Sequence, residues 1–266
     1  MKLFGLIGYP LSHSFSKRFF SEKFEKEGIV DAKYELFPIE KITMLPDLLS
    51  DNPDLRGLNV TVPYKISILK YLDWIENDAK SAGAVNCVVI SAESPVQAAF
   101  GGELGVVGHN FRLEGYNTDI YGFEVSLKPL LKDQHDTALV LGDGGAAQAV
   151  KCVLDKLGIA ITLVTRKPQT GALLFSELKP HHIKQHKLIV NTTPVGMSPN
   201  IEECPPIPYE AITDEHLLYD LIYNPEETLF LKKGAERGAV IKNGYEMLIL
   251  QAEKSWEIWT TAKNQI

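Results

Sequence analysis

The chain has 266 residues, a formal net charge of −7 and 45% hydrophobic residues. This composition is typical of a globular protein with one large or two small domains, and it excludes disorder as the main state. No apolar run reaches the roughly 18–20 residues that a transmembrane helix needs. The acidic balance disfavours non-specific binding to nucleic acid or a membrane surface, but it allows a small anionic ligand held by a local cluster of cations.

The N-terminus leads directly into a strand-like pattern without a small-residue cleavage site, so we expect no signal peptide. Three cysteines, Cys87, Cys152 and Cys204, are far apart and show no C-x-x-C spacing. This pattern favours a reducing compartment and predicts a cytoplasmic protein without a disulfide framework or a zinc site.

Strand-like and helix-like segments alternate in the first half of the chain. Strands are predicted at residues 3–8, 33–39 and 58–62, and helices at 14–28, 42–50 and 63–72. Pro63 suits the first position of the last of these helices. This βαβαβα order predicts a largely parallel sheet with helices packed against it.

Short runs separated by glycine turns follow this region. They predict strands, joined as hairpins, at residues 85–91, 97–100, 104–108 and 112–116.

A second unit begins after a helix predicted at residues 120–131. Strands are predicted at 138–141, 159–164, 188–191 and 217–221, and helices at 146–157, 226–238 and 245–260. The last helix has Leu248, Ala252, Trp256 and Trp259 on one stripe, so it must pack against an apolar surface.

Residues 142–147 fit the pattern G-x-G-x-x-A between a predicted strand and a predicted helix. Glycines in this position let backbone amides approach a pyrophosphate, and the helix N-terminus adds partial positive charge. The alternative is a tight turn that binds nothing. Asp143 would repel a phosphate unless its side chain points to solvent.

The next predicted strand ends at Thr165, Arg166 and Lys167. Sites that prefer NAD usually place an acidic residue here for the ribose hydroxyl. Two cations instead favour a 2′-phosphate and therefore NADP. The alternative is an exposed basic turn.

Residues 59–65 end a predicted strand and begin a predicted helix. Asn59 and Thr61 share one face of the strand, because strand side chains alternate. Lys65 would lie in the first helical turn, where the positive helix end disfavours the ammonium form. Such a lysine can act as a general acid or base. The alternative is a solvated surface lysine.

Polar residues also occur at three other places. Ser14 and Ser16 can offer hydroxyls to a carboxylate, and the alternative is ordinary capping of a helix by Ser12 or Ser14. Asn86 lies in an apolar segment, where a ligand contact and a structural hydrogen bond are equally plausible. Residues 117–119 end a predicted strand and precede a helix. Taken by itself, this motif favours an Asx cap of that helix. His182 and His186 are four residues apart, but flanking lysines favour a solvated face over a metal site.

Together these segments resemble the shikimate dehydrogenase family over Gly8–Trp259. The matching motifs lie at residues 8–10, 13–16, 59–65 (N-V-T-x-P-x-K), 82–86, 117–119, 191–197, 219–223, 244 and 251–252. The departures are Lys17 in place of proline, Asp143 in the glycine loop, residues 165–167 in place of Asn-Arg-Thr/Ser, and a longer glycine-rich stretch at 91–115.

The resemblance implies an α/β protein with two domains and the active site in the cleft between them. An N-terminal mixed-sheet substrate domain would comprise residues 1–118 and the C-terminal helix 243–266. A Rossmann-like NADP-binding domain would comprise residues 119–242.

The implied reaction is the reversible NADPH-dependent reduction of 3-dehydroshikimate to shikimate by a monomer or homodimer, without a metal. The implied catalytic residues are Lys65 and Asp119. The implied substrate-binding residues are Ser14, Ser16, Asn59, Thr61, Asn86, Tyr223 and Gln251. The implied cofactor-binding residues are Gly142, Gly144, Gly145, Ala146, Thr165, Arg166, Lys167, Leu221 and Gly244.

Two alternatives remain open at the level of the sequence. One is a quinate/shikimate dehydrogenase with relaxed cofactor use. The other is a non-catalytic ligand-sensing relative, which would be expected to lose Lys65 or Asp119, although both are present here.

Overall fold

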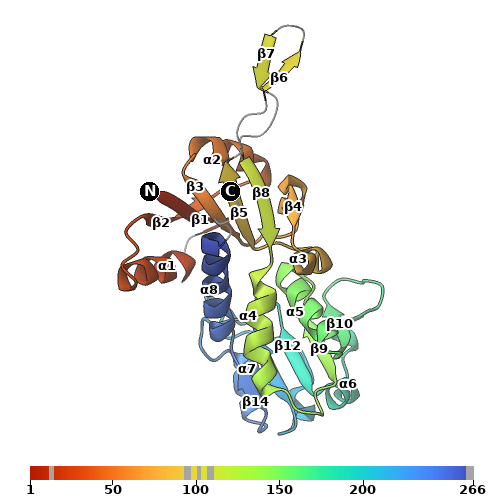
Figure 1. Cartoon of the computed structure of the whole chain (residues 1–266). Coiled ribbons are helices and arrows are strands. Elements are labelled where there is room, and N and C mark those ends of the chain that lie inside the picture. The colour runs from red at the N-terminus through yellow and green to blue at the C-terminus, as the bar shows by residue number, and fades with distance from the viewer. Residues whose placement is uncertain (12–14, 93–96, 101–102, 107–110, 262–266) are drawn as a thin grey trace. The chain divides into compact units, whose positions relative to one another are not determined.

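The chain forms two compact units, shown in Figure 1 as a computed structural model that describes residues 1–11, 15–92, 97–100, 103–106 and 111–261. The first unit comprises residues 1–118 and 255–266, and the second comprises residues 119–254. The chain leaves the first unit after Thr118 and returns to it at Ser255, within the C-terminal helix.

A six-stranded mixed sheet forms the centre of the first unit, in the order β2-β1-β3-β5-β8-β4 (Figure 1). Its strands are β1 (Lys2–Gly8), β2 (Ala32–Pro38), β3 (Leu55–Val60), β4 (Trp74–Ile75), β5 (Cys87–Ala92) and β8 (Phe111–Tyr116). β1 pairs parallel with β2 and β3, whereas β5 pairs antiparallel with both β3 and β8. The parallel arrangement predicted from the alternating pattern therefore covers β1, β2 and β3, and the short β4 pairs parallel with β8. β6 (Gln97–Phe100) and β7 (Glu103–Val106) form a separate two-stranded sheet.

Helical segments connect these strands and cover the sheet. They are α1 (Phe15–Lys26), η1 (Ile42–Met44), α2 (Leu45–Asp51), η2 (Ser67–Tyr71) and α3 (Asn77–Ala82), where η marks a 3-10 helix. The buried side chains of β1, β3 and β5, including Ile7, Leu58 and Val88, form one apolar cluster with Leu45 of α2. The predicted segments at 14–28 and 42–50 are thus helical.

The expected helix at residues 63–72 is wrong. Tyr64 is buried and its hydroxyl donates to the Ile39 carbonyl at 2.6 Å, while its backbone N–H donates to Thr61 at 2.9 Å. These contacts hold a turn at residues 62–66, and only the short η2 follows. Lys65 therefore lies in a turn, and no α-helix N-terminus forms at its position.

The end of the C-terminal helix α8 (Tyr245–Thr261) packs on aromatic residues of the first unit. The Trp259 ring stacks on Phe4 at 5.0 Å between centroids and lies 5.5 Å from Phe20. The Trp259 indole N–H donates to the Val88 carbonyl at 3.0 Å. This confirms that the apolar stripe requires a docking surface, and identifies β1, α1 and β5 as that surface for its C-terminal part.

A parallel six-stranded sheet forms the second unit, in the order β11-β10-β9-β12-β13-β14. Its strands are β9 (Thr137–Leu141), β10 (Ala160–Thr165), β11 (Ala172–Leu174), β12 (Leu188–Asn191), β13 (Leu217–Asp220) and β14 (Val240–Lys242). Its helical segments are α4 (Thr118–Leu127), η3 (Lys128–Leu130), α5 (Gly145–Lys156), η4 (Phe175–Glu177), α6 (Pro180–Gln185), η5 (Tyr209–Ala211) and α7 (Leu229–Ala235). The strand order and the central β9–α5–β10 unit are those of a dinucleotide-binding fold.

Alternating side chains direct the helices to opposite faces of this sheet. Leu139, Ile189 and Leu218 point to the face that α6 and α7 cover with Ile183 and Phe230. On the opposite face, the Phe123 ring of α4 contacts Tyr219 at 4.9 Å, and Ser126 lies 2.7 Å from the Tyr219 hydroxyl. The strands read as continuous apolar runs because both faces are buried.

Short elements account for most of what the patterns did not predict, namely β4, β11, β14, α3 and α6. None of them is longer than six residues. Segments of this length show no periodicity of their own, and pairing with a neighbouring strand or packing on a sheet defines them.

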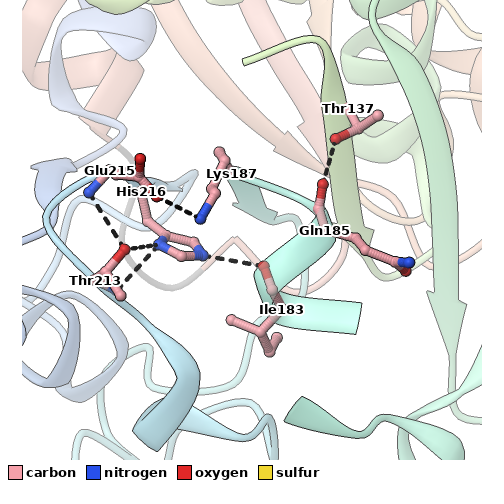
Figure 2. A network of polar contacts seen from close by, with 7 residues as sticks. All are labelled: Thr137, Ile183, Gln185, Lys187, Thr213, Glu215 and His216. Carbon is pink, nitrogen blue, oxygen red and sulfur yellow. Dashed lines mark hydrogen bonds and ion pairs between the residues drawn. The ribbon is translucent and has the colours of Figure 1, made fainter. Parts of the chain in front are cut away.

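A buried histidine lies at the amino-terminal ends of the strands in the second sheet. Figure 2 shows the Nδ1 atom of His216 accepting the Thr213 N–H at 3.0 Å, while Nε2 lies 3.0 Å from the Ile183 carbonyl of α6. Because Nδ1 accepts, Nε2 holds the proton and donates it. An ion pair between Lys187 and Glu215 at 2.8 Å lies beside this contact. His216 thus joins α6 to the start of β13.

Acid should weaken the second unit. Burial lowers the pKa values of His216 and His135 below the usual 6.5. The unfolded chain binds protons at these residues as the pH falls through about 6.5, whereas the folded chain does not. Their contribution to stability is therefore complete above about pH 6.5 and is lost below it.

The measurement is the thermal unfolding midpoint of the second unit between about pH 7.5 and about pH 5. The midpoint should fall with pH, and His216→Gln should reduce this dependence. His181→Gln, at an exposed neighbouring position, is the control and should leave the dependence unchanged. A midpoint that is independent of pH over this range would contradict the argument.

Within the described residues, no helix combines the length and the apolarity required to cross a membrane.

Candidate functional site

Five buried side chains of the first unit form a hydrogen-bonded group, which we call the polar cluster: Tyr34, Asn59, Asn86, Thr118 and Ser255. Each is at most 6% exposed. Tyr34 donates its hydroxyl to Asn59 Oδ1 at 2.9 Å, and Asn59 Nδ2 donates to Ser255 Oγ at 2.9 Å. The Ser255 hydroxyl lies 3.2 Å from that of Thr118, and Asn86 Nδ2 donates to Thr118 Oγ1 at 3.0 Å.

Asn59 directs its amide into this cluster. Besides the two contacts above, Asn59 Nδ2 donates to the Asn86 carbonyl at 3.3 Å. An amide group has two donor hydrogens, so both are used within the protein. The expected role of Asn59 as a substrate contact stays a prediction. Its visible contribution is to hold β3 against α8.

Ser16 of α1 adjoins the polar cluster through Tyr34. Burial raises the pKa of the Tyr34 hydroxyl well above its usual value, and a hydrogen bond from Ser16 partly offsets this effect. Lys17, where the family has proline, pairs with Glu35 at 2.7 Å. That hydrogen bond, with another from Lys33, lowers the Glu35 pKa. Ser14, the other expected carboxylate contact, lies outside the described residues.

Asn86 joins the segment before β5 to the end of β8. Asn86 Oδ1 accepts the Thr118 backbone N–H at 2.7 Å, and Asn86 donates its own N–H to the Tyr116 carbonyl at 3.1 Å. Asn117 Nδ2 donates to the Ala84 carbonyl at 2.9 Å, so this side chain links the segment after β8 to the segment before β5.

Thr61 and Lys65 lie just beyond the carboxyl end of β3. The Thr61 N–H donates to the Ile7 carbonyl at 2.9 Å, and the Lys65 carbonyl accepts from Val85 at 2.8 Å. Both side chains are half-buried. The backbone of Lys65 is therefore anchored to the segment that leads into β5.

Asp119 lies in the first turn of α4, directly after Thr118. A carboxylate in a first turn is stabilised by the partial positive charge of the helix N-terminus. Asp119 is 6% exposed. The last two expected substrate residues belong to the second unit: Gln251 of α8 donates to the Leu248 carbonyl at 2.9 Å, and Tyr223 is partly exposed after β13.

The glycine loop of the second unit has the geometry of an anion-binding turn. Gly142 has φ = +102°, a conformation that favours glycine, and a Cβ there would lie 2.8 Å from Thr192 Oγ1. Gly144 caps α5, and no side chain makes a capping hydrogen bond to that helix. A Cβ on Gly144 would meet only open space. The first N–H groups of Gly145 and Ala146 thus stand at an open helix start.

Thr165 ends β10, and Arg166 and Lys167 follow it, next to that loop. Thr165 is buried and donates its hydroxyl to the Lys167 carbonyl at 2.7 Å, which shapes the turn. Arg166 and Lys167 are exposed. A cavity of about 420 Å³ is lined by Arg166 together with Leu174, Phe175, Ser176 and Pro206.

Leu221 and Gly244 pack directly against each other. A Cβ on Gly244 would lie 2.1 Å from the Leu221 carbonyl, so only glycine fits. Buried Asp220 directly precedes Leu221. It accepts hydrogen bonds from Asn191 at 3.0 Å and Thr228 at 2.6 Å. Burial raises the Asp220 pKa to about 6. Asp220 thereby ties together the loops after β12 and β13.

Asp143 is exposed in the glycine loop, so its side chain avoids the turn. We expect Asp143→Ala to tighten NADP binding by up to about tenfold, because it removes a carboxylate that repels a phosphate through solvent. The gain should shrink as salt rises. Titration of binding by nicotinamide fluorescence measures it. Asp155→Ala at the far end of α5 is the control, and weaker binding by Asp143→Ala would refute the repulsion argument.

His182 and His186 make contacts within the protein. His182 Nδ1 accepts the Lys179 N–H at 3.1 Å, and His186 Nε2 lies 2.9 Å from the Thr162 hydroxyl. In the described part of the chain, no three metal-ligating side chains gather into a potential metal site.

Sequence reasoning missed Tyr34, Thr118, Ser255 and Asp220 as members of these groups. The first three sit in ordinary strand and helix patterns. Thr118 lies within the motif at residues 117–119, and Asp220 is a charged residue at the end of an apolar strand. Tyr34 and Ser255 are identified by their partners in the folded chain.

Three comparisons place the chain among known proteins. The family model described as the shikimate dehydrogenase substrate binding domain matches residues 6–88. A shikimate dehydrogenase (NADP(+)) from Methanococcus aeolicus is 36% identical over 282 residues, covering 100% of this chain and 94% of the relative.

Solved structures match over nearly the whole chain. The crystal structure of shikimate dehydrogenase from Aquifex aeolicus has a TM-score of 0.79 at 32% identity, covering 98% of this chain and 93% of that one. A shikimate 5-dehydrogenase from Thermus thermophilus, in complex with NADP(H) and shikimate, has a TM-score of 0.79 at 30% identity, covering 98% and 94%.

Proposed function

The chain belongs to the shikimate dehydrogenase family, and we propose that it catalyses the reversible NADP-dependent interconversion of 3-dehydroshikimate and shikimate. The observation that carries the proposal is the full-length similarity to NADP-dependent shikimate dehydrogenases, with Lys65 and Asp119 retained in the family's motifs. The reaction belongs to chorismate and aromatic amino acid biosynthesis.

The first unit is assigned to the substrate. Residues 6–88, which match the substrate binding domain of the family, lie within it. Asn86 belongs to the polar cluster of this unit and Ser16 adjoins it, while Thr61 and Lys65 follow the carboxyl end of β3. In open sheets with parallel strands, ligands bind beyond these carboxyl ends. Hydroxyl and amide groups suit the carboxylate and hydroxyls of a polyhydroxylated ring acid.

The second unit is assigned to the cofactor, and its residues fit NADP. The uncapped N-terminus of α5 and the open space beside Gly144 suit a pyrophosphate. Arg166, at the cavity beyond β10, suits a 2′-phosphate, which a guanidinium binds through paired N–H groups. In the same turn, the Thr165 hydroxyl bonds to the Lys167 carbonyl, and the Lys167 side chain adds a positive charge. Bound NADPH supplies a hydride to the ketone of the substrate.

Lys65 delivers the proton that this reduction requires. Negative charge develops on the ketone oxygen, and an ammonium group beside that oxygen both stabilises the charge and donates a proton. Asp119 accepts a hydrogen bond from a substrate hydroxyl and so orients the ring. In shikimate oxidation the same residues act in reverse, and Lys65 removes the hydroxyl proton.

The test measures the absorbance of reduced nicotinamide with purified protein, shikimate and either NADP or NAD. We expect rapid NADP reduction with shikimate and much slower reduction with NAD or with quinate. A clear preference for NAD and quinate would replace this proposal by the relaxed quinate/shikimate enzyme. Binding of shikimate without any turnover in either direction would identify a ligand-sensing relative.

A further inference from the structure

The polar cluster lies where the chain crosses between its two units. The chain leaves the first unit after Thr118 and returns to it at Ser255. The hydroxyl oxygens of these two residues are 3.2 Å apart and are 1% and 0% exposed. Although 137 positions separate them in sequence, they form one buried contact.

Hydrogen bonds from both sides fix this hydroxyl pair. Asn86 holds Thr118 twice, through its Nδ2 to Oγ1 at 3.0 Å and through its Oδ1 to the Thr118 backbone N–H at 2.7 Å. Asn59 donates to Ser255 at 2.9 Å. Thr118 is thus held both at its backbone N–H and at its side-chain hydroxyl.

Apolar and aromatic groups keep water away from the cluster. The Tyr34 ring stacks on Phe20 at 4.5 Å between centroids. The Cys87 thiol, which hydrogen-bonds to Ser255, is fully buried, and burial raises its pKa to about 12. Hydrogen bonds in such surroundings are stronger and more directional than hydrogen bonds exposed to water.

Asp119 is joined to this group by a single peptide bond. It follows Thr118 and lies in the first turn of α4, which begins at Thr118. Any change in the position of the Thr118 backbone therefore moves the start of α4 and the Asp119 carboxylate. Asn86, an expected substrate contact, is oriented by the same hydroxyl.

We propose that Thr118 and Ser255 are positioning residues for the reaction, and that their buried hydroxyl pair sets the places of the Asp119 carboxylate and the Asn86 amide. Neither hydroxyl touches substrate. This inference rests on the proposed function. It means that Ser255 of α8, where the chain re-enters the first unit, helps to position the expected substrate contacts.

A matched pair of substitutions tests it. Thr118→Val keeps the shape of the side chain and removes the hydroxyl, whereas Thr118→Ser keeps the hydroxyl. Misplacement of a reacting group by about 1 Å can cost about 100-fold in rate. We therefore expect Thr118→Val to lower kcat for shikimate oxidation about 10- to 100-fold, and Thr118→Ser to restore most of it. The dissociation constant for NADP should be unchanged in both variants.

Ser255→Ala gives an independent arm that removes a single oxygen. Its kcat should fall in the same range, and the double variant Thr118→Val/Ser255→Ala should lose no more than the worse single variant, because both act through one contact. Thermal unfolding of each variant, measured alongside, shows that the rates refer to folded protein.

Three results would overturn the proposal. Thr118→Val and Ser255→Ala could lower the unfolding midpoint with kcat unchanged, which would make the cluster purely structural. Thr118→Ser could be as impaired as Thr118→Val, which would assign the effect to packing of the whole side chain and not to the hydroxyl. The losses could multiply in the double variant, which would separate the two residues. Absence of shikimate oxidation by the unmodified protein would instead remove the proposed function itself.

Discussion

Lys65→Met is expected to lower kcat for shikimate oxidation by about 100- to 10,000-fold, while shikimate binds with nearly unchanged affinity. Methionine has a similar length and volume but holds no proton. The loss therefore falls on the step in which the hydroxyl proton leaves, and not on recognition of the ring acid. Lys65 is anchored through its carbonyl to Val85, so the substitution should leave the backbone in place.

The measurement combines steady-state kinetics with a direct binding titration of shikimate. Lys70→Met is the matched control, because Lys70 is an exposed lysine of the following η2 segment and its ammonium group lies over the Tyr71 ring. Near-normal turnover by Lys65→Met would remove Lys65 from the mechanism. Loss of shikimate binding with unchanged kcat would make it a binding residue only.

Arg166→Leu is expected to raise the KM for NADP by about 10- to 100-fold and to leave the KM for NAD nearly unchanged. A hydrogen bond to a charged group contributes roughly 1.5–3 kcal/mol, which corresponds to about one to two powers of ten in affinity. NAD has no 2′-phosphate and does not gain from this contact. The variant should therefore lose much of the preference between the two cofactors.

Calorimetry with the fragment 2′,5′-ADP measures the same contact without turnover, and 5′-AMP serves as the ligand that lacks the phosphate. Arg237→Leu is the control, since Arg237 is an exposed arginine just beyond α7. If Arg166→Leu weakened 5′-AMP as much as 2′,5′-ADP, Arg166 would contact the adenosine and not the 2′-phosphate.

Local patterns in the sequence identify most of the regular elements. Apolar runs bounded by glycine, proline or charged residues mark β1, β3, β9 and β12, since a strand buried on both faces is mostly apolar. The turn that starts at Gly142 is likewise readable, because the need for positive φ selects glycine whatever the rest of the fold does. The motifs around Lys65 and Asp119 are short and continuous in the chain, so they too are visible without a structure.

The tertiary structure alone decides which polar groups meet. Asn59 and Ser255 are 196 positions apart, and nothing near either residue in the sequence indicates the other. The same holds for residues 63–72, where proline favours a helix start but burial of Tyr64 and its bond to Ile39 hold a turn. A buried amide or hydroxyl must find a partner wherever the fold places one. Local propensity amounts to tenths of a kcal/mol per residue, whereas an unpaired buried polar group costs about 1–3 kcal/mol. Long-range pairing therefore prevails over the local pattern at these positions.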